Sequence, residues 1–197
     1  GGWTDPSGKK GLASATMDML NEGAGRRNAA TISADLREIG ASLGTSAGLD
    51  GSGVSLQVMK KNLEPGLDIM ADVTLRPTFP RSDWELMRKK RLAGLEEARQ
   101  DPSSMAGRAW AHLMYGDSYA GQLSNEYAYK RMSTKDMKKW WQVHVAPSHS
   151  MVLVGGDITL EEAIPLLESR FGTWKDPRRM ASHDKPTADA LPTFEQS

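Results

Sequence analysis

Hydrophobic side chains recur every three or four residues over most of this chain, the spacing that gathers them on one face of a helix. The first such segment groups Leu12, Ala15 and Met19 and predicts a helix over residues 10–21. The same pattern, ended by glycines and prolines, predicts helices over residues 31–39 and 82–100 and helices that begin near residues 63, 101, 133 and 159.

Two segments depart from the helical period. Val54, Leu56 and Val58 alternate with polar residues, as in a half-buried strand, and residues 42–49 supply a partner strand across a hairpin. Four consecutive apolar residues at 151–154 predict a short central strand. The order of the elements indicates an α+β fold, with helices packed on one face of a mostly antiparallel sheet.

Residues that can accept hydrogen bonds from free backbone N–H groups stand at the start of several predicted helices. Asp101 precedes Pro102, the usual order of an N-cap residue and a proline in the first turn. The other expected caps are Ser82 with Glu85, Ser133, and Thr159 with Glu162.

Composition limits the class of protein. With 197 residues and 39% hydrophobic content, the chain can bury a full core, and one domain is expected. Its 25 basic residues balance its 25 acidic ones, so charge gives no reason to expect nucleic acid or an anionic membrane as a partner. No apolar run approaches the roughly 20 residues of a membrane span. The absence of cysteine excludes disulfides and thiolate metal sites and indicates no compartment.

The domain is expected to span residues 1–175. Residues 176–197 combine proline, alanine and charged residues with little periodicity, so we expect a linker towards a following domain. The chain starts at Gly1, with neither an initiator methionine nor a signal peptide. We therefore interpret it as a piece of a longer polypeptide whose domain has lost its N-terminal strand.

A series of landmarks in a fixed order resembles a known family. Residues 11–20 read GLASATMDML and follow the segment TDPSGKK, which leads into the first predicted helix. Further landmarks are residues 20–24, 36–43, 101–102, 122–129 and 151–158. In order and spacing these segments resemble the peptidase M16 (insulinase, pitrilysin-like) family, from Trp3 to about Trp174.

The resemblance implies where catalytic members would bind zinc. Those members follow Gly-Leu-Ala with the inverted motif His-x-x-Glu-His, whereas this chain has Ser14 and Asp18 at the histidine positions and Met17 at the glutamate position. The third zinc ligand, a glutamate on the long helix, corresponds to Gly94, or to Leu95 if the register shifts by one residue. Zinc hydrolysis needs about three protein ligands and a base. We therefore expect no catalytic, cofactor-binding or metal-binding residue in this chain.

The resemblance also implies a role. M16 peptidases consist of two homologous halves, of which one binds zinc and the other closes a chamber around the peptide substrate. This chain is expected to be a non-catalytic domain, inactive alone, that supports peptide hydrolysis by a zinc-bearing half in the same chain or another. The arginine and tyrosine that non-catalytic halves contribute to transition-state binding are expected beyond this chain. Bacterial members favour a periplasmic location, and the substrate and oligomeric state are not determined.

Three other interpretations stay open. The chain could be a non-proteolytic scaffold, as M16-like core subunits of a respiratory complex are. Ser14 and Asp18 could form a metal-independent catalytic pair, although no histidine precedes His112 to act as a base. His144 and His149 could bind zinc, although neither has metal-ligand spacing with another histidine or an acidic residue.

Two surface features have competing readings. The basic run at residues 88–91 falls in a periodic helix and is interpreted as a solvated face, since nucleic-acid binding would need a net basic domain with interleaved aromatic residues. Trp140 and Trp141 could form a peptide-docking surface, but one of the two is expected in the core.

Overall fold

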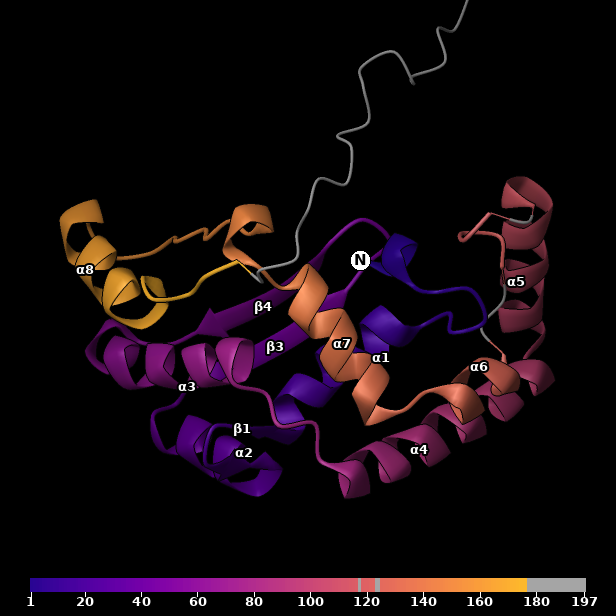
Figure 1. Ribbon diagram of the computed structural model, residues 1–197, viewed down its shortest axis with the longest axis horizontal. Helices are drawn as coiled ribbons and strands as arrows, with labels where there is room; N and C mark the ends of the chain where they lie inside the picture. The colour runs from indigo at the N-terminus through magenta and orange to yellow at the C-terminus, as the bar shows by residue number, and fades with distance from the viewer. Residues whose placement is uncertain (117, 123–124, 177–197) are drawn as a thin grey trace, which may run out of the picture.

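The computed structural model describes residues 1–116, 118–122 and 125–176 (Figure 1). Its α-helices are α1 (Leu12–Met19), α2 (Ala29–Glu38), α3 (Leu63–Leu75), α4 (Arg81–Gln100), α5 (Pro102–Tyr115), α6 (Glu126–Arg131), α7 (Thr134–His144) and α8 (Leu160–Phe171). Its strands are β1 (Gly23–Ala24), β2 (Arg27–Asn28), β3 (Ser42–Ala47) and β4 (Ser52–Gln57). Short 3-10 turns are η1 (Gly2–Thr4), η2 (Leu20–Glu22), η3 (Lys60–Asn62) and η4 (Pro147–His149).

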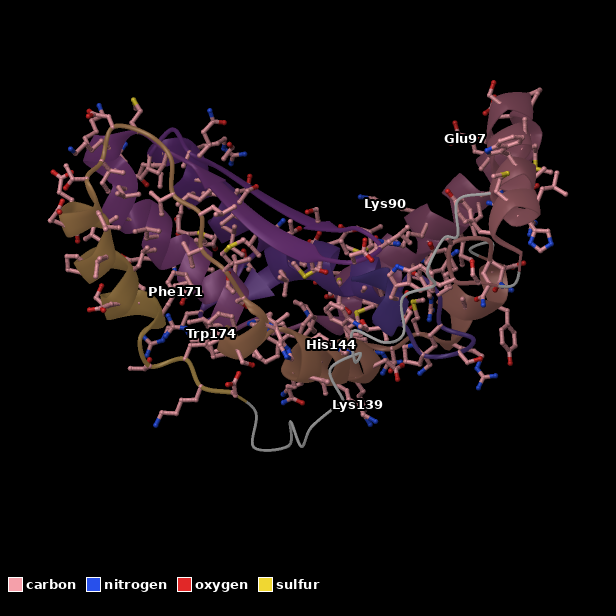
Figure 2. All side chains as sticks on the ribbon, turned by 90° about the horizontal axis from the view of Figure 1, so that it is seen from above. Lys90, Glu97, Lys139, His144, Phe171 and Trp174 are labelled. Carbon is pink, nitrogen blue, oxygen red and sulfur yellow. The ribbon has the colours of Figure 1, made fainter. Side chains whose placement is uncertain are left out.

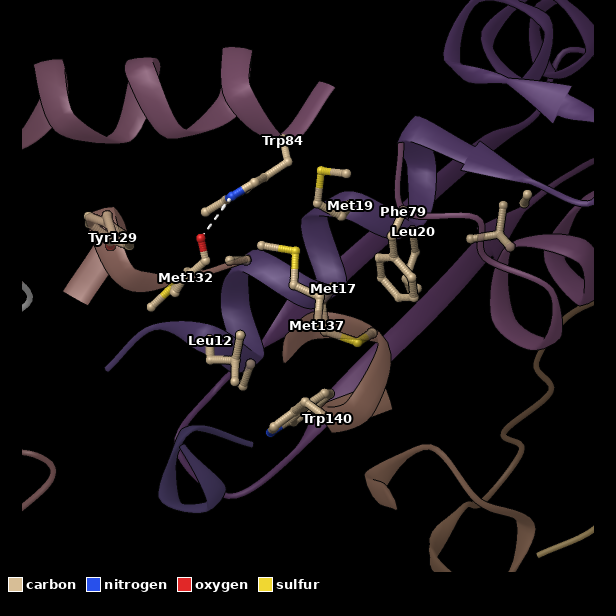
Figure 3. Packing of buried hydrophobic residues seen from close by; sticks show 14 of the residues in the cluster. Leu12, Met17, Met19, Leu20, Phe79, Trp84, Tyr129, Met132, Met137 and Trp140 are labelled. Atoms are coloured by element: carbon tan, nitrogen blue, oxygen red, sulfur yellow. Dashed lines mark hydrogen bonds between the residues drawn. The ribbon is translucent and has the colours of Figure 1, made fainter. Parts of the chain in front are cut away.

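Helix α1 lies at the centre of the hydrophobic core. Six of its eight residues are buried, and Leu12 and Met19 are no more than 2% exposed. The helix packs against β3 and against α7, whose Met137 and Trp140 lie beside it in Figure 3. Because apolar side chains occur on most of its circumference, α1 is buried within the molecule instead of lying on its surface.

Strands β3 and β4 form an antiparallel hairpin over this core. The register pairs Ser42 with Gln57 at one end and Ala47 with Ser52 at the other. Alternate residues are half-buried on one face, where β3 packs against α1 and β4 against α3, while the opposite face is exposed. The shorter pair, β1 with β2, is also antiparallel. The expected α+β architecture, with helices on one face of an antiparallel sheet, is confirmed.

Helix α4 leads from the core to a flank that it forms with α5 and α6 (Figures 1 and 2). Trp84, near its start, is 1% exposed, and its Nε1 donates to the carbonyl oxygen of Met132 at 3.2 Å. Helix α5 follows directly and contains no buried residue. Its side chains include Trp110 and Leu113, which are 65% and 80% exposed.

Helix α8 is joined to α3 and to the preceding turn η3 by ion pairs. Arg170 pairs with Asp68 at 2.7 Å and with Glu64 at 3.4 Å. Lys60 of η3 pairs with Glu162 at 3.0 Å, at the start of α8. Because such exposed pairs contribute little free energy each, they orient α8 more than they stabilise it.

Most of the expected helix caps are confirmed. Asp101 accepts a hydrogen bond from the N–H group of Ser104 at 2.7 Å, with Pro102 as the first helical residue. Ser133 begins α7 and Thr159 begins α8, each within a reciprocal capping box. These three helices therefore start where local hydrogen-bonding chemistry places them.

The capping box expected at Ser82 and Glu85 is wrong. Helix α4 begins at Arg81 with Pro80 at the N-cap, so Ser82 already lies inside the first turn. The Ser82 hydroxyl donates to Asp83 at 2.8 Å, and Glu85 pairs with Arg88 one turn further along. A proline can fix the extended backbone that precedes a helix, and here the N-cap lies two residues earlier than the serine suggests.

The central strand expected at residues 151–154 is also wrong. This segment belongs to no strand, and its four side chains are between 52% and 81% exposed. A strand forms where a neighbouring strand takes up its backbone hydrogen bonds. Within the described residues β3 and β4 pair with each other, and neither pairs with this segment.

Asp176 is the last residue that the structure describes. The expected linker at 176–197 therefore lies almost wholly outside the described residues, and the expected domain span of 1–175 stays a prediction. Among the helices of the described residues, none has the length and apolar character needed to cross a bilayer.

Candidate functional site

A carboxylate from the preceding loop fixes the start of α1. The oxygens of Asp5 accept hydrogen bonds from the N–H groups of residues 11, 12 and 13 at 2.6, 3.1 and 2.7 Å, and from the Tyr119 hydroxyl at 2.7 Å. First-turn N–H groups have no partner within a helix, and negative charge is favourable beside them. Gly11 supplies the left-handed backbone of the turn, at φ +91°. Burial and the bond to Asp5 raise the pKa of Tyr119, so its hydroxyl stays a donor.

The three motif positions on α1 fall on two sides of the helix. Ser14 and Asp18 lie one turn apart and are partly exposed. Met17 is 2% exposed and lies within the core (Figure 3). Met17, which the family resemblance leads us to expect at the general-base position, is therefore a buried apolar side chain.

Arg91 of α4 binds the two partly exposed polar residues of this helix, Ser14 and Asp18. Its Nη2 donates to the Ser14 hydroxyl at 3.1 Å and also to the Asp18 carboxylate. Its Nη1 donates to the Tyr129 hydroxyl at 3.4 Å, and the guanidinium carbon lies 5.5 Å from the centre of the Tyr129 ring. One guanidinium therefore links α1, α4 and α6, with its own side chain only 17% exposed.

Arg91 is the residue of this site that sequence reasoning missed. The interpretation of residues 88–91 as a solvated face is wrong for Arg91, although Lys89 and Lys90 are exposed and Arg88 pairs with Glu85 along the same helix. Arg91 follows the buried Trp84 by seven residues, so both lie on the same face of α4. That spacing was the available signal.

The position on α4 that is expected to match the third zinc ligand lies in open space. Gly94 is exposed, and a Cβ atom added there would meet nothing within 4 Å. Glu96 and Glu97 are exposed, and Glu96 pairs with Arg99 at 3.1 Å on the same helix. Arg91 is thus the α4 side chain that reaches Ser14 and Asp18.

The side chains at these positions do not fit a zinc ion. Zinc in proteins takes imidazole, thiolate or carboxylate ligands, usually three or four of them. The site has one carboxylate, from Asp18, and that carboxylate is already bound to a guanidinium, which repels a metal cation. Among the described residues there is no cluster of three histidine, cysteine, aspartate or glutamate side chains placed to hold a metal.

The histidines of the described residues form no metal-binding group at this site. A ring nitrogen of His112 lies 3.2 Å from the Gly121 carbonyl oxygen, and His144 stacks on Trp140 with ring centres 4.9 Å apart. His149 is exposed in η4, and His183 lies outside the described residues. Among the described residues, neither His144 nor His149 belongs to a group of three side chains that could hold a metal, and the Ser14 hydroxyl accepts a hydrogen bond from Arg91.

Both tryptophans of α7 anchor the fold. Trp140 is 4% exposed and its Nε1 donates to the Thr4 hydroxyl at 2.9 Å. Trp141 is partly buried, and its Nε1 donates to the Thr74 carbonyl oxygen at 3.0 Å. Both indole N–H groups donate to acceptors within the protein, so neither indole N–H group is available to a bound peptide.

Comparison with known sequences decides the family. Residues 1–125 match the sequence profile of insulinase, peptidase family M16. The chain belongs to the peptidase M16 family. It is similar to an uncharacterized zinc protease of Mycobacterium leprae, with 22% identity over 165 residues, which make up 83% of this chain and 37% of that protein. The chain thus spans little more than a third of this M16 relative.

Solved structures agree with the M16 assignment. A peptidase M16 inactive domain from Pseudomonas fluorescens is similar at 26% identity and a TM-score of 0.67, over 71% of this chain and 35% of that one. A protease from Helicobacter pylori superposes over 92% of this chain and 45% of its own, with a TM-score of 0.84 and 17% identity. A periplasmic protease from Escherichia coli reaches 0.78 at 15% identity, over 90% of this chain and 21% of its own.

Proposed function

We propose that this chain is a non-catalytic domain of an M16-type zinc metallopeptidase assembly. The observation that carries the proposal is the filled space between α1 and α4, where Arg91 binds Ser14 and Asp18. The buried thioether of Met17 supports it, because a thioether cannot take a proton from water. Likeness to a solved M16 domain described as inactive points the same way.

In this role the chain helps to enclose a peptide substrate and supports its hydrolysis by a homologous, zinc-bearing half. The zinc ion belongs to that half, in the same chain or another. The hairpin supports a contact with peptide, because within the described residues each of β3 and β4 pairs on one side only. An extended peptide can add to a free strand edge through main-chain hydrogen bonds, whatever its sequence. A periplasmic location is part of the proposal, by similarity to the E. coli periplasmic protease.

Cleavage of a quenched, unstructured peptide in added zinc tests this function. The arms are this chain alone, the matching zinc-bearing half alone, and the two together at rising ratios. We expect no cleavage by this chain, slow cleavage by the zinc-bearing half, and a saturable rise of at least tenfold for the pair. Controls replace this chain with a neutral protein of similar size, or add a chelator to the complete assembly.

A non-proteolytic scaffold is the alternative that the same assay separates. If the pair forms a complex but cleaves no faster than the zinc-bearing half alone, the scaffold interpretation replaces the proposal. If this chain cleaves peptide alone, and S14A/D18A abolishes the cleavage, it is an enzyme of a different kind and the proposal is wrong.

A further inference from the structure

We propose that Arg91 is a fixed cation that joins α1 to α4 in the place that zinc takes in catalytic relatives. The inference rests on the proposed function for the correspondence of Ser14, Asp18 and Gly94 with zinc ligands. It adds a residue that no motif predicts and a role for it: the guanidinium replaces the ion as the link between the two helices.

The contacts of Arg91 suit that role. A metal holds two helices together by binding ligands from both, and here one guanidinium accomplishes this from α4 by donating to two oxygens of α1. A planar guanidinium carries several N–H donors in fixed directions, so it can serve both acceptors together. The Tyr129 ring on α6 holds the same group from a third element. Among the hydrogen bonds and ion pairs of the described residues, those of Arg91 are the direct links between α1 and α4.

The charges around Asp18 also favour a cation at the position of Arg91. Asp18 lies in the second half of α1, near the helix C-terminus, where a negative side chain is unfavourable. The pKa of neighbouring Glu22 is raised by burial first and then by the charges of Asp83 and Asp18, while Lys90 opposes the shift. Removing the guanidinium would leave the Asp18 carboxylate without its ion-pair partner in this acidic neighbourhood.

A double-mutant cycle tests the link itself. R91Q and D18N should each lower the Tm by roughly 2 to 6 °C, and the double variant should fall no further than the worse single variant. R88Q is the matched control, because Arg88 lies on the same helix and, among the described residues, forms its ion pair with Glu85 of that helix. The inference is overturned if R91Q has the same Tm as R88Q, or if the Tm losses of R91Q and D18N add fully in the double variant.

Zinc binding by designed variants tests whether the Arg91 guanidinium lies where zinc would bind. S14H/D18H/G94E supplies three ligands while Arg91 is retained, and adding R91Q removes the competing cation. Gly94 has room for a side chain, so this substitution does not crowd the core. We expect R91Q to raise the zinc affinity of the S14H/D18H/G94E protein at least tenfold, measured by competition with a chromophoric chelator, with R88Q giving no gain.

Two other results of the zinc titration would contradict the inference. Equal zinc affinity with and without R91Q would mean that Arg91 lies outside the metal position. Absence of zinc binding in both proteins, with native circular dichroism, would mean that the three positions do not converge, and the inference fails. The peptide assay is independent of both results: a chain that passes these tests yet never raises the partner's activity retains the Arg91 link and loses the proposed function.

Discussion

Helices α1 and α5 have similar sequence patterns and opposite surroundings. Both are amphipathic segments with apolar residues at helical spacing. Helix α1 is enclosed by β3, α7 and the side chains of α4, and six of its residues are buried. Helix α5 packs chiefly on α4, contains no buried residue, and exposes Trp110 and Leu113. An apolar stripe therefore predicts a helix, whereas its burial depends on which elements reach it.

The two helices also differ at their starts. Helix α1 begins at a carboxylate from a distant position in the loop, Asp5, which binds three backbone N–H groups and the Tyr119 hydroxyl. Helix α5 is capped by the residue immediately before it, Asp101, which accepts a hydrogen bond from the N–H group of Ser104. The first cap therefore ties several segments together, and the second stabilises one turn of one helix.

The largest expected difference is between two tryptophan-to-alanine variants, one in the core and one on the exposed helix α5. Trp84 is 1% exposed against the core, so W84A should lower the free energy of unfolding by about 3–5 kcal/mol. Trp110 is 65% exposed on α5, so W110A should change it by less than about 0.5 kcal/mol. Chemical denaturation of both variants measures this. Similar losses would mean that Trp110 of α5 is as well packed as Trp84 of α4 in the core around α1.

A smaller difference is expected between the two caps. D5A removes an acceptor shared by four donors and should lower the free energy of unfolding by about 2–3 kcal/mol. D101A frees one exposed N–H group and should fray the start of α5 with little effect on the global transition. Hydrogen exchange, measured together with denaturation, separates local from global loss. Global destabilisation by D101A as large as that by D5A would contradict the distinction.

The smallest effect is expected in the pH dependence of stability. Burial alone would raise the pKa of Asp136 in α7, but hydrogen bonds from Lys9 and Ser133 outweigh it and lower the pKa. The unfolded chain therefore binds this proton more readily, so the contribution is full above about pH 5 and is lost as the pH falls through the lowered pKa. Because the side chain is partly exposed and solvent screens its ion pair with Lys9, the contribution is less than about 1 kcal/mol. In D136N, the Tm should therefore fall less steeply as the pH is lowered below about 5. An unchanged dependence of Tm on pH in D136N would show that Asp136 contributes nothing to it.

Particular residues explain where sequence reasoning succeeded. The hairpin follows from the alternation of Val54, Leu56 and Val58, and the start of α7 from the Ser133 capping box, since both depend on neighbours a few residues away. The expectation that Ser14, Met17 and Asp18 lie on the first helix is met, because a ten-residue stretch fixes their helical spacing.

The errors have a different origin. Residues 151–154 have the composition of a strand, but a strand needs a partner, and none pairs with them among the described residues. Arg91 belongs to a basic run that looks solvated, and only its register against Trp84 on a 20-residue helix turns it inward. The missing partner of residues 151–154 and the partners of Arg91 on α1 are not contained in a short window of sequence, although the spacing of Arg91 from Trp84 is.

The sequence by itself determined most of the helices, though not α6, and also the hairpin, the family and the identity of the side chains at the motif positions. These depend on local periodicity, capping chemistry and the order of landmarks. The tertiary structure alone decided that α1 is enclosed while α5 is exposed, and that the space beside Ser14 and Asp18 is occupied by the guanidinium of Arg91. Arg91 is more than 70 residues away from both in the chain, and contacts over such separations depend on how helices pack and not on what stands beside a residue.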